Sequence, residues 1–239
     1  LTRSVLESAR SLGADVITGA EFTHAQLGSD AVELAYVRNS ETRSLVSRVL
    51  VNAAGPWVNH VQAKVSRPSG EAVEMLDMDL VQGSPIVVPG RISHPYYLEA
   101  PQDGRAVFVV PWKNNIMVGT TENHYQGNPA DVRPLDSEID YLLEIYNHYF
   151  RRSLKRDQLI DVFAGLRVLP GGSDDASNKS RDTHFLEDRP RRPRLVSIYG
   201  GKLTSYRAAA DRLLGRIRGT LPAATPLADT RRLKLPIVD

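Results

Sequence analysis

The sequence predicts a mixed α+β and α/β fold with a large, mostly antiparallel sheet in the middle of the chain. Two patterns indicate it. Near each end, a strand pattern runs through a glycine corner into a helix pattern, around residue 55 and again around residue 200. Between these corners, short strand patterns alternate with turn signals, which is typical of antiparallel sheets. A length of 239 residues with 41% hydrophobic side chains suffices for one sizeable core or for parts of two domains.

The first 65 residues are expected to form a helix, several strands and then a strand–glycine–helix corner. Ser4-Val5-Leu6-Glu7 fits a capping box at the start of a short helix, which Gly13 ends. Strand patterns follow over residues 14–22, 31–37 and 43–52. The last of them runs into Ala53-Ala54-Gly55, after which Pro56 suits the first turn of another helix.

The middle of the chain reads mainly as strands. Their patterns cover residues 73–88, 96–98, 106–112, 115–120 and 159–169. Lys113-Asn114-Asn115 predicts a tight turn, since asparagine tolerates positive φ. Residues 137–150 carry apolar side chains at helical spacing, with Asp136 as the expected cap. Residues 170–188 are rich in Gly, Ser and Asp and are expected to form a loop.

The last third repeats the pattern of the first. Arg194 to Tyr199 predicts a short buried strand, and Gly200-Gly201-Lys202 follows it. Thr204 is expected to cap a helix over residues 206–217. The Pro/Ala/Thr-rich tail from Gly219 resembles a linker.

Composition and charge exclude several classes of protein. The chain has no cysteine, so it has no disulfide, no thiolate nucleophile and no cysteine-ligated metal. No apolar run approaches the ~20 residues of a membrane-spanning helix. The net charge of +2 is too balanced to imply nucleic-acid binding. Because Leu1 is not methionine, we expect the chain to be an internal piece of a longer protein.

The corner Gly200-Gly201-Lys202-Leu203-Thr204 is the best-placed candidate for chemistry. Two glycines let the backbone turn sharply between a strand and a helix. A helix N-terminus suits a phosphate, a carboxylate or the electron-rich carbonyl of a reduced cofactor, and Lys202 adds a positive charge. An ordinary glycine turn with a solvated lysine is the alternative. Neither a P-loop nor a G-x-G-x-x-G pattern is present.

The corner Asn52-Ala53-Ala54-Gly55-Pro56-Trp57 is the second candidate. Small residues after a buried strand let a ligand come close, or simply pack a helix tightly against the strand. Both interpretations stay open. The six histidines show no metal-ligand spacing, and no G-x-S-x-G elbow is present. His94 reads either as a general base or as a loop residue.

Arginine is the third feature, with 24 Arg among the 30 basic residues. A guanidinium fork binds phosphate or carboxylate through two hydrogen bonds, and Arg167 lies at the end of an apolar strand pattern. Arg181 is a further candidate, or a partner of Asp182. The clusters over 151–156 and 189–194 are expected to be solvated faces, with contact to an anionic partner as the alternative.

Five segments together resemble a known family. They are Leu50–Trp57, Val109–Trp112, Val118–Glu122, Gly165–Arg167 and Gly200–Arg207. In this order and approximate spacing, they resemble segments of FAD-dependent glycerol-3-phosphate dehydrogenases, which belong to the D-amino-acid-oxidase-like flavoenzymes. The resemblance extends from about Ser4 to Arg218.

The resemblance implies a two-part fold. A Rossmann-type domain binds FAD, and a substrate domain with a large, mostly antiparallel sheet covers the flavin. Residues 1–65 are expected to form part of the FAD-binding domain and residues 66–193 the substrate domain. Residues 194–239 are expected to return to the FAD-binding domain and to start a C-terminal linker.

The resemblance also implies an activity, the oxidation of sn-glycerol 3-phosphate to dihydroxyacetone phosphate. Hydride passes from C2 of the substrate to N5 of FAD, and electrons then pass to a quinone or another acceptor. Nucleic acid is not an implied partner. The implied location is cytoplasmic, with peripheral association of the full-length protein with the inner face of the cytoplasmic membrane.

Site residues carry over from the resemblance position by position. Those matched to substrate binding are Arg167, Arg181 and Lys202, and those matched to the cofactor are Ala53, Ala54, Gly55, Trp57, Gly200, Gly201, Lys202, Leu203 and Thr204. The implied catalytic residues are Arg167 and Lys202, with His94 as a substitute base. A metal is not implied.

One position departs from the family pattern. The family often has Gly-Ser-His where this chain has Gly83-Ser84-Pro85, and proline neither accepts nor donates a proton. The base is therefore left open between His94, Lys202 with water, and a changed activity. Two other functions also stay open. One is a related flavoenzyme acting on an amino or hydroxy acid, and the other is a non-catalytic module that binds anions or nucleic acid.

We expect FAD in the full-length protein but weak or no FAD binding by this chain alone. The family's glycine fingerprint for the FAD pyrophosphate lies near its N-terminus, and no such pattern occurs here. A purified preparation of the chain should therefore be colourless. A flavin absorbance band in that preparation would contradict the expectation.

Overall fold

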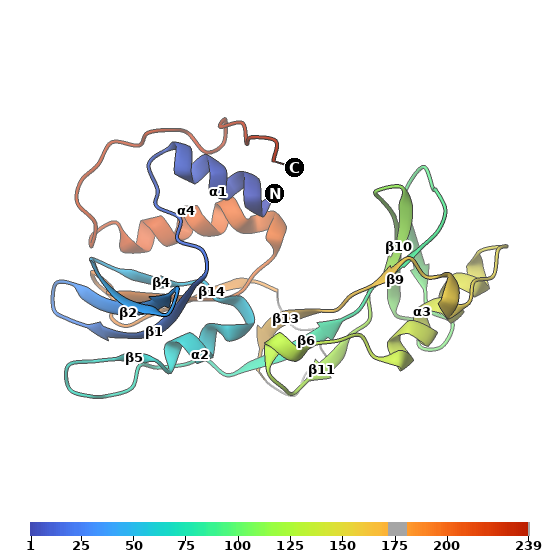
Figure 1. The fold of residues 1–239 in the computed structure, drawn as a ribbon, viewed down its shortest axis with the longest axis horizontal. Coiled ribbons are helices and arrows are strands. Elements are labelled where there is room, and N and C mark those ends of the chain that lie inside the picture. Colours follow the sequence, from blue (N-terminus) through green and yellow to red (C-terminus); the bar gives the residue numbers. More distant parts are fainter. Residues whose placement is uncertain (172–180, 239) are drawn as a thin grey trace. The chain divides into compact units, whose positions relative to one another are not determined.

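The computed structural model describes residues 1–171 and 181–238 and confirms a mixed α and β fold with mostly antiparallel sheets (Figure 1). Its α-helices are α1 (Thr2–Ser11), α2 (Val58–Gln62), α3 (Asp136–Tyr149) and α4 (Tyr206–Ile217). Its first eight strands are β1 (Ala20–Leu27), β2 (Val32–Arg38), β3 (Glu41–Ser47), β4 (Leu50–Asn52), β5 (Val65–Ser66), β6 (Met78–Gly83), β7 (Ile86–Val88) and β8 (Tyr96–Glu99). The others are β9 (Ala106–Trp112), β10 (Asn115–Gly119), β11 (Asn123–Tyr125), β12 (Asp161–Val162), β13 (Gly165–Pro170), β14 (Thr183–Glu187) and β15 (Leu195–Gly200).

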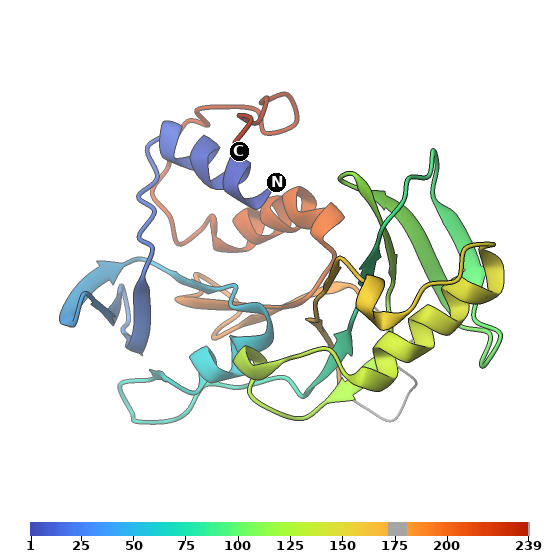
Figure 2. The same ribbon diagram turned by 45° about the vertical axis from the view of Figure 1, so that its right-hand side comes forward.

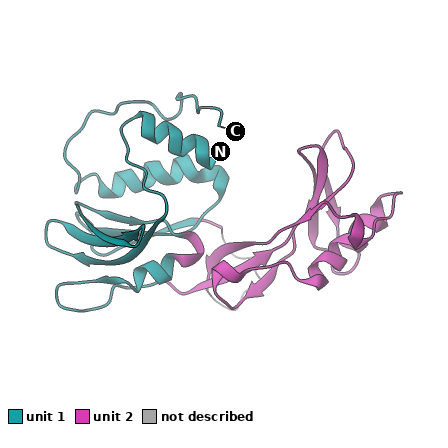
Figure 3. Ribbon diagram, viewed as in Figure 1, with its two compact units in different colours: residues 1–54, 58–75, 183–239 teal, residues 55–57, 76–182 magenta. Residues whose placement is uncertain are grey.

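The chain divides into two compact units (Figure 3). Unit 1 comprises residues 1–54, 58–75 and 183–239, and unit 2 comprises residues 55–57 and 76–182. The boundaries between these compact units, 75/76 and 182/183, differ from the expected domain boundaries at 65/66 and 193/194. Val73 belongs to the core of unit 1, and β14 pairs with β15, so both boundaries move into the middle segment.

Unit 1 contains two sheets. One has the strand order β3-β2-β1-β5, and the other has the order β14-β15-β4. In the second sheet β15 runs parallel to β4 and antiparallel to β14. Helices α4 and α2 lie on opposite faces of this sheet (Figures 1 and 2). A βα arrangement with helices on both faces is the local architecture of doubly wound domains.

Unit 2 is built on the antiparallel sheet β12-β7-β10-β9-β8, and α3 packs against one face of it. The burial pattern of strand β9 shows why α3 covers only one face of this sheet. Its Val107 and Val109 are buried, whereas Phe108 between them is half exposed, so only one face of the strand belongs to the core. Leu142 and Ile145 of α3 are fully buried against that face. A second, three-stranded sheet has the order β11-β6-β13.

The expected helix starts are wrong in three places. Helix α1 begins at Thr2, before the expected cap Ser4, and α3 begins at Asp136 itself. The side chain that caps α3 is Glu138, which accepts a hydrogen bond from Leu135 N at 2.9 Å. A 3-10 turn over Leu203–Ser205 precedes α4, so Thr204 lies in this turn and caps no helix.

Several expected strands are shorter or divided. Residues 43–52 belong to β3 and β4, residues 159–169 to β12 and β13, and in each case the two strands join different sheets. The first strand begins only at Ala20. Period-2 alternation does not report which sheet a strand joins, because both sheets need the same inward and outward pattern.

The expected loop and turn also need correction. Residues 183–187 of the expected loop form β14, and residues 172–180 of it lie outside the described residues. In the β9–β10 turn, the residue with positive φ is Lys113, at 53°, rather than an asparagine.

The expected solvated face over residues 189–194 is wrong for Arg194. This side chain is buried and donates to the backbone carbonyls of Ser29 and Arg48, at 3.1 and 2.9 Å. It therefore ties together segments of unit 1. None of the described helices is long and apolar enough to cross a membrane.

Leu142→Ala should lower the free energy of unfolding of the chain by about 2–5 kcal/mol, because it leaves a cavity in the core of unit 2. Urea unfolding followed by circular dichroism measures the change. Leu135→Ala is the control, since its side chain is 50% exposed and should change the free energy by less than about 0.5 kcal/mol. Equal effects of the two substitutions would contradict the packing of α3.

Candidate functional site

The two small-residue corners meet at one edge of a sheet in unit 1. Strands β4 and β15 are parallel, with Leu50 opposite Leu195 and Asn52 opposite Ser197. The carboxyl ends of parallel strands lie at the same edge, where ligands of α/β folds bind. Ala53 and Ala54 follow β4 at this edge, and the Gly200-Gly201-Lys202 corner ends β15. Gly55 and Trp57 continue the first corner in a 3-10 turn that belongs to unit 2.

A buried polar network sets the register of these two strands. Asn52 of β4 is 3% exposed, and its Nδ2 donates to Val58 O at 2.9 Å and to Gln62 Oε1 at 3.3 Å. Ser197 of β15 donates its hydroxyl to the same Gln62 oxygen. Because unpaired buried polar groups are costly, this network fixes β4, α2 and β15 against one another.

The β15 corner needs its glycines. Gly200 and Gly201 have φ angles of +68° and +93°, which other residues rarely adopt. A Cβ at position 201 would also lie 2.7 Å from Thr183 Oγ1. Lys202, Leu203 and Thr204 beyond it are exposed. The edge is thus open and lined by small residues, with one lysine and the start of α4 beside it, and this donor set fits a flavin cofactor.

In unit 2 the structure brings Arg167 and Arg181 together. Arg167 lies on β13, and its Nη1 donates to Glu122 Oε1 at 2.8 Å. Arg181 Nη2 donates to the same oxygen at 3.1 Å. The side chains of Arg167 and Glu122 are only 25% and 19% exposed, so solvent screens this pair less than a surface pair. Two guanidiniums around one carboxylate leave a net positive charge, which favours an anion.

Burial lowers the pKa of Arg167, the Glu122 carboxylate raises it, and the neighbouring Arg181 lowers it again, with a net decrease from its ordinary value. The guanidinium nevertheless stays charged. Sequence reasoning missed Glu122 as a functional residue, although it ends the Val118–Glu122 segment. Its place directly after two threonines at the end of a strand was the available signal.

Gly83 of β6 packs directly against this group. A Cβ at position 83 would lie 3.0 Å from Nη2 of Arg167 and 2.6 Å from Oγ1 of Thr120. The backbone oxygen of Thr121 would also lie 3.0 Å from this Cβ, so any larger side chain at position 83 would force its neighbours to shift. Glycine at this position therefore lets the two threonines and the guanidinium lie close to β6.

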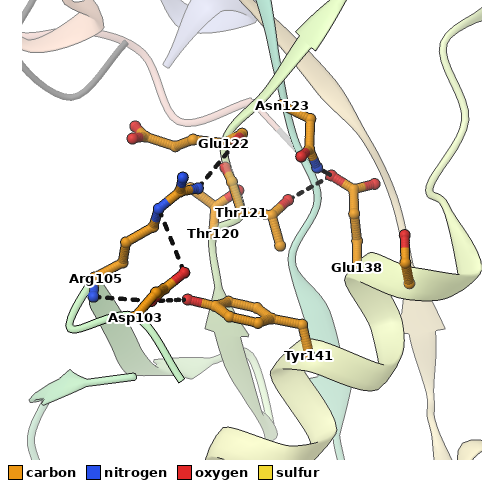
Figure 4. Close-up of a pocket in the computed structure, with 9 residues that line it drawn as sticks. Asp103, Arg105, Thr120, Thr121, Glu122, Asn123, Glu138 and Tyr141 are labelled. Carbon is orange, nitrogen blue, oxygen red and sulfur yellow. Dashed lines mark hydrogen bonds and ion pairs between the residues drawn. The ribbon is translucent and has the colours of Figure 1, made fainter. Parts of the chain in front are cut away.

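Behind Glu122, the buried carboxylate of Glu138 accepts hydrogen bonds from five donors (Figure 4 shows part of this group). They are Thr121 Oγ1 at 2.6 Å and Asn123 Nδ2 at 2.8 Å on Oε1, and Ser84 Oγ at 2.6 Å, Gln82 Nε2 at 2.7 Å and Leu135 N at 2.9 Å on Oε2. Burial is the largest influence on the Glu138 pKa and raises it. The hydrogen bonds from one backbone amide and three side chains outweigh burial and hold the pKa below its ordinary 4.5.

A pocket of about 220 Å³ opens beside the segment 120–123 (Figure 4). Arg105 borders it, donates to Glu122 O at 3.2 Å and forms an ion pair with Asp103 at 3.4 Å. Tyr141 donates its hydroxyl to Asp103 at 2.9 Å. Burial, with a smaller effect of Asp103, raises the pKa of Tyr141 to about 12, so this hydroxyl keeps its proton at neutral pH.

The structure does not bring His94 to this group. Tyr96 of β8 pairs with Val109, and His94 precedes it on the side of the β9–β10 turn, whereas Glu122 follows the opposite end of β10. His94 is exposed, with Nδ1 2.8 Å from Ser93 Oγ and its ring centroid 4.8 Å from that of Tyr96. Pro85 is buried between β6 and β7. Within the described residues, no three His, Asp or Glu side chains are placed to hold a metal.

Acid should weaken unit 2 through Glu138. Because its pKa is lower in the folded state, the stability it contributes is complete above about pH 4.5 and is lost as the pH falls through the folded value. The difference in unfolding free energy between the parent chain and Glu138→Gln should therefore shrink below pH 4.5, by at most about 1.4 kcal/mol per pH unit. Urea unfolding between pH 3 and 6 measures it, and a pH-independent difference would contradict the ionised state.

Comparisons with known proteins agree with the family resemblance noted from the sequence. The family described as DAO, FAD dependent oxidoreductase, matches residues 1–211. The aerobic glycerol-3-phosphate dehydrogenase of Escherichia coli (strain K12) is 34% identical over 225 residues, which are 90% of this chain and 44% of that protein. The D-erythritol 1-phosphate dehydrogenase of Brucella abortus (strain 2308) is 33% identical over 215 residues, 88% of this chain and 42% of that protein.

Among solved structures, the glycerol-3-phosphate dehydrogenase from Bacillus halodurans complexed with FAD has a TM-score of 0.75 and 25% identity. The match covers 90% of this chain and 41% of that one. The chain therefore spans less than half the length of the relatives it matches. With nearly nine-tenths of its residues matched, it belongs to the family of FAD dependent oxidoreductases.

Proposed function

We propose that the complete protein containing this chain oxidises sn-glycerol 3-phosphate to dihydroxyacetone phosphate, with FAD as its oxidant. The observation that carries the proposal is the convergence of Arg167 and Arg181 on one oxygen of Glu122. A phosphate dianion suits the net positive charge of this group, and arginine forks match its oxygens. The Escherichia coli and Bacillus halodurans relatives, both named glycerol-3-phosphate dehydrogenases, support the same substrate.

The open edge of β4 and β15 is the proposed place of FAD. Ala53, Ala54 and Gly55 would let the cofactor approach the backbone after β4. Gly200 to Thr204 would border it after β15, with Trp57 beside the first corner. When bound, FAD supplies N5 as the acceptor of the hydride that leaves C2 of the substrate. Lys202 and the N-terminus of α4 favour negative charge at this edge.

A water molecule held by the Lys202 ammonium is the proposed acceptor of the proton from the C2 hydroxyl, and the positive charge of Lys202 would stabilise the developing alkoxide. Pro85 has no titratable group, and His94 lies at the other end of its sheet from Glu122. A base has to reach the hydroxyl directly or through one water, so the position of His94 within unit 2, away from Glu122, argues against His94 as the base.

A phosphorylated polyol longer than glycerol is a second candidate substrate. The Brucella abortus relative, named for D-erythritol 1-phosphate, matches nearly the same share of the chain at nearly the same identity as the Escherichia coli one. Dye reduction by the complete protein tests glycerol 3-phosphate, D-erythritol 1-phosphate, glycerol, and amino and hydroxy acids in parallel. Preference for glycerol 3-phosphate supports the proposal, and activity on unphosphorylated acids alone refutes it.

Electrons are proposed to pass to a quinone, with the complete protein held peripherally at the inner face of the cytoplasmic membrane. Such an enzyme should reduce a soluble quinone analogue faster than it consumes oxygen. Oxygen consumption at the same rate as substrate oxidation would instead assign oxygen as the acceptor.

Arg167→Ala in the complete protein should raise KM for glycerol 3-phosphate about 10- to 100-fold, the loss of one charge-assisted contact. KM for unphosphorylated glycerol should change little. Steady-state dye reduction measures both constants. Arg151→Ala, which removes an exposed arginine of the same unit, is the control. An unchanged KM for glycerol 3-phosphate would remove Arg167 from the phosphate site.

Lys202→Met should lower kcat by about 100-fold or more, since the loss of one positioned donor that stabilises developing negative charge commonly costs that much. His94→Asn should leave kcat near that of the parent. Both variants are compared at equal flavin content, read from their absorbance. The reverse order of effects would assign the base to His94.

A further inference from the structure

Two short segments, residues 82–84 and 121–123, each bind Glu138 with their first and third residues and face Arg167 with the residue between them. Gln82 and Ser84 donate to Glu138, and Gly83 between them packs against Arg167 Nη2. On the neighbouring segment, Thr121 and Asn123 both donate to Glu138, and Glu122 between them binds Arg167. In Figure 4 the Glu122 carboxylate points away from Glu138, as alternation along an extended chain requires.

The five donors leave Glu138 little freedom. Its side chain is 2% exposed, and its two oxygens divide the donors, with Thr121 and Asn123 on Oε1 and the other three on Oε2. A carboxylate accepts and never donates, so every neighbour must present a hydrogen to it. Together with the β6–β11 ladder, in which Gln82 pairs with Asn123, this one side chain of α3 holds Gly83 and Glu122 in place relative to each other.

A contribution to folding stability does not by itself explain a buried carboxylate at position 138. Replacing buried charges by apolar groups is often neutral or stabilising, provided the whole group is replaced. What the carboxylate uniquely supplies is a common acceptor for two segments that end beside the same arginine. Arg105 holds the main chain of the second segment as well, through Glu122 O at 3.2 Å.

We infer that Glu138 is a positioning residue for the anion site, which holds Gly83 and Glu122 so that Arg167 and Arg181 converge. The inference rests on the proposed function for its kinetic test, but its geometric content concerns residues of unit 2 alone. Because Glu138 is only 2% exposed, we place it behind the site rather than in contact with a bound anion. It acts through the main chain of the two segments that it joins.

Glu138→Gln tests the inference in the complete protein. The carboxamide keeps the shape, but its NH2 group must face either the Thr121–Asn123 pair or the Gln82–Leu135 pair, and each pair contains an N–H donor. KM for glycerol 3-phosphate should rise about 10-fold, while KM for glycerol and kcat at equal flavin content should stay within about twofold. A purely structural role would lower the flavin content and leave the KM of the remaining enzyme unchanged, which would overturn the inference.

Two further variants separate a loss of positioning from a general loss of folding. Asn123→Ala removes one donor from an exposed position and should raise KM for glycerol 3-phosphate about threefold. Glu144→Gln, on the exposed side of the same helix, is the matched control and should leave KM unchanged. A KM increase in Glu144→Gln equal to that in Glu138→Gln would overturn the inference, because any charge lost from α3 would then suffice.

A crystal structure of the Glu138→Gln protein gives a readout that needs no substrate. The 2.8 Å contact between Arg167 Nη1 and Glu122 Oε1 should lengthen or break. Retention of that contact, with Arg181 still on the same oxygen, would overturn the inference. If the parent protein does not oxidise glycerol 3-phosphate, the proposed function fails, and this structure still decides the role of Glu138.

Discussion

A single buried carboxylate organises unit 2. Glu138 gathers donors from the β6–β7 crossover, from the segment between β10 and β11, and from the start of its own helix. A buried charge persists only where hydrogen bonds replace the water it has lost. The three segments therefore have to stay where they satisfy it. Arg167 and Arg181 lie beside two of these segments, the one after β6 and the one before β11. The positions of these segments therefore also fix the geometry of the anion site.

In unit 1, neutral side chains rather than a charged one form the buried hydrogen bonds that hold segments together. Asn52, Gln62 and Ser197 form a buried network between β4, α2 and β15. Among the described residues, no buried side-chain nitrogen or oxygen lacks a hydrogen-bond partner. Because amide and hydroxyl groups pair without a desolvated charge, the network holds the two parallel strands in register at low cost. Its consequence is the open edge where the two small-residue corners meet.

The arginines, which outnumber the lysines, lie in distinct environments. Arg194 is buried and donates to backbone carbonyls, so its role is structural. Arg156 bridges Asp136 and Asp140 on the exposed side of α3. Arg167 and Arg181 instead share the Glu122 carboxylate, so these three side chains together carry a net positive charge. The described arginines thus differ in the acceptors that surround them.

Local patterns predicted much of the fold. Strand β9 has the bounds expected from alternation, and the two strand–glycine–helix corners lie where glycine and proline indicated. The caps were less predictable, because Ser4 and Thr204 have suitable side chains while other groups lie at the helix starts. The assignment of strands to sheets was not predictable from alternation, as the division of residues 43–52 between β3 and β4 shows.

The sequence by itself determined the chemistry available at each position, including glycines that turn, an arginine at the end of a strand and a proline where the family often has histidine. The order of five short segments in the sequence also indicated the family. Only the tertiary structure decided which of these groups meet. Glu122 lies 45 and 59 residues from its two arginines, and Glu138 lies 54 residues from Ser84. Contacts at such separations depend on strand register and helix packing, which no local pattern encodes.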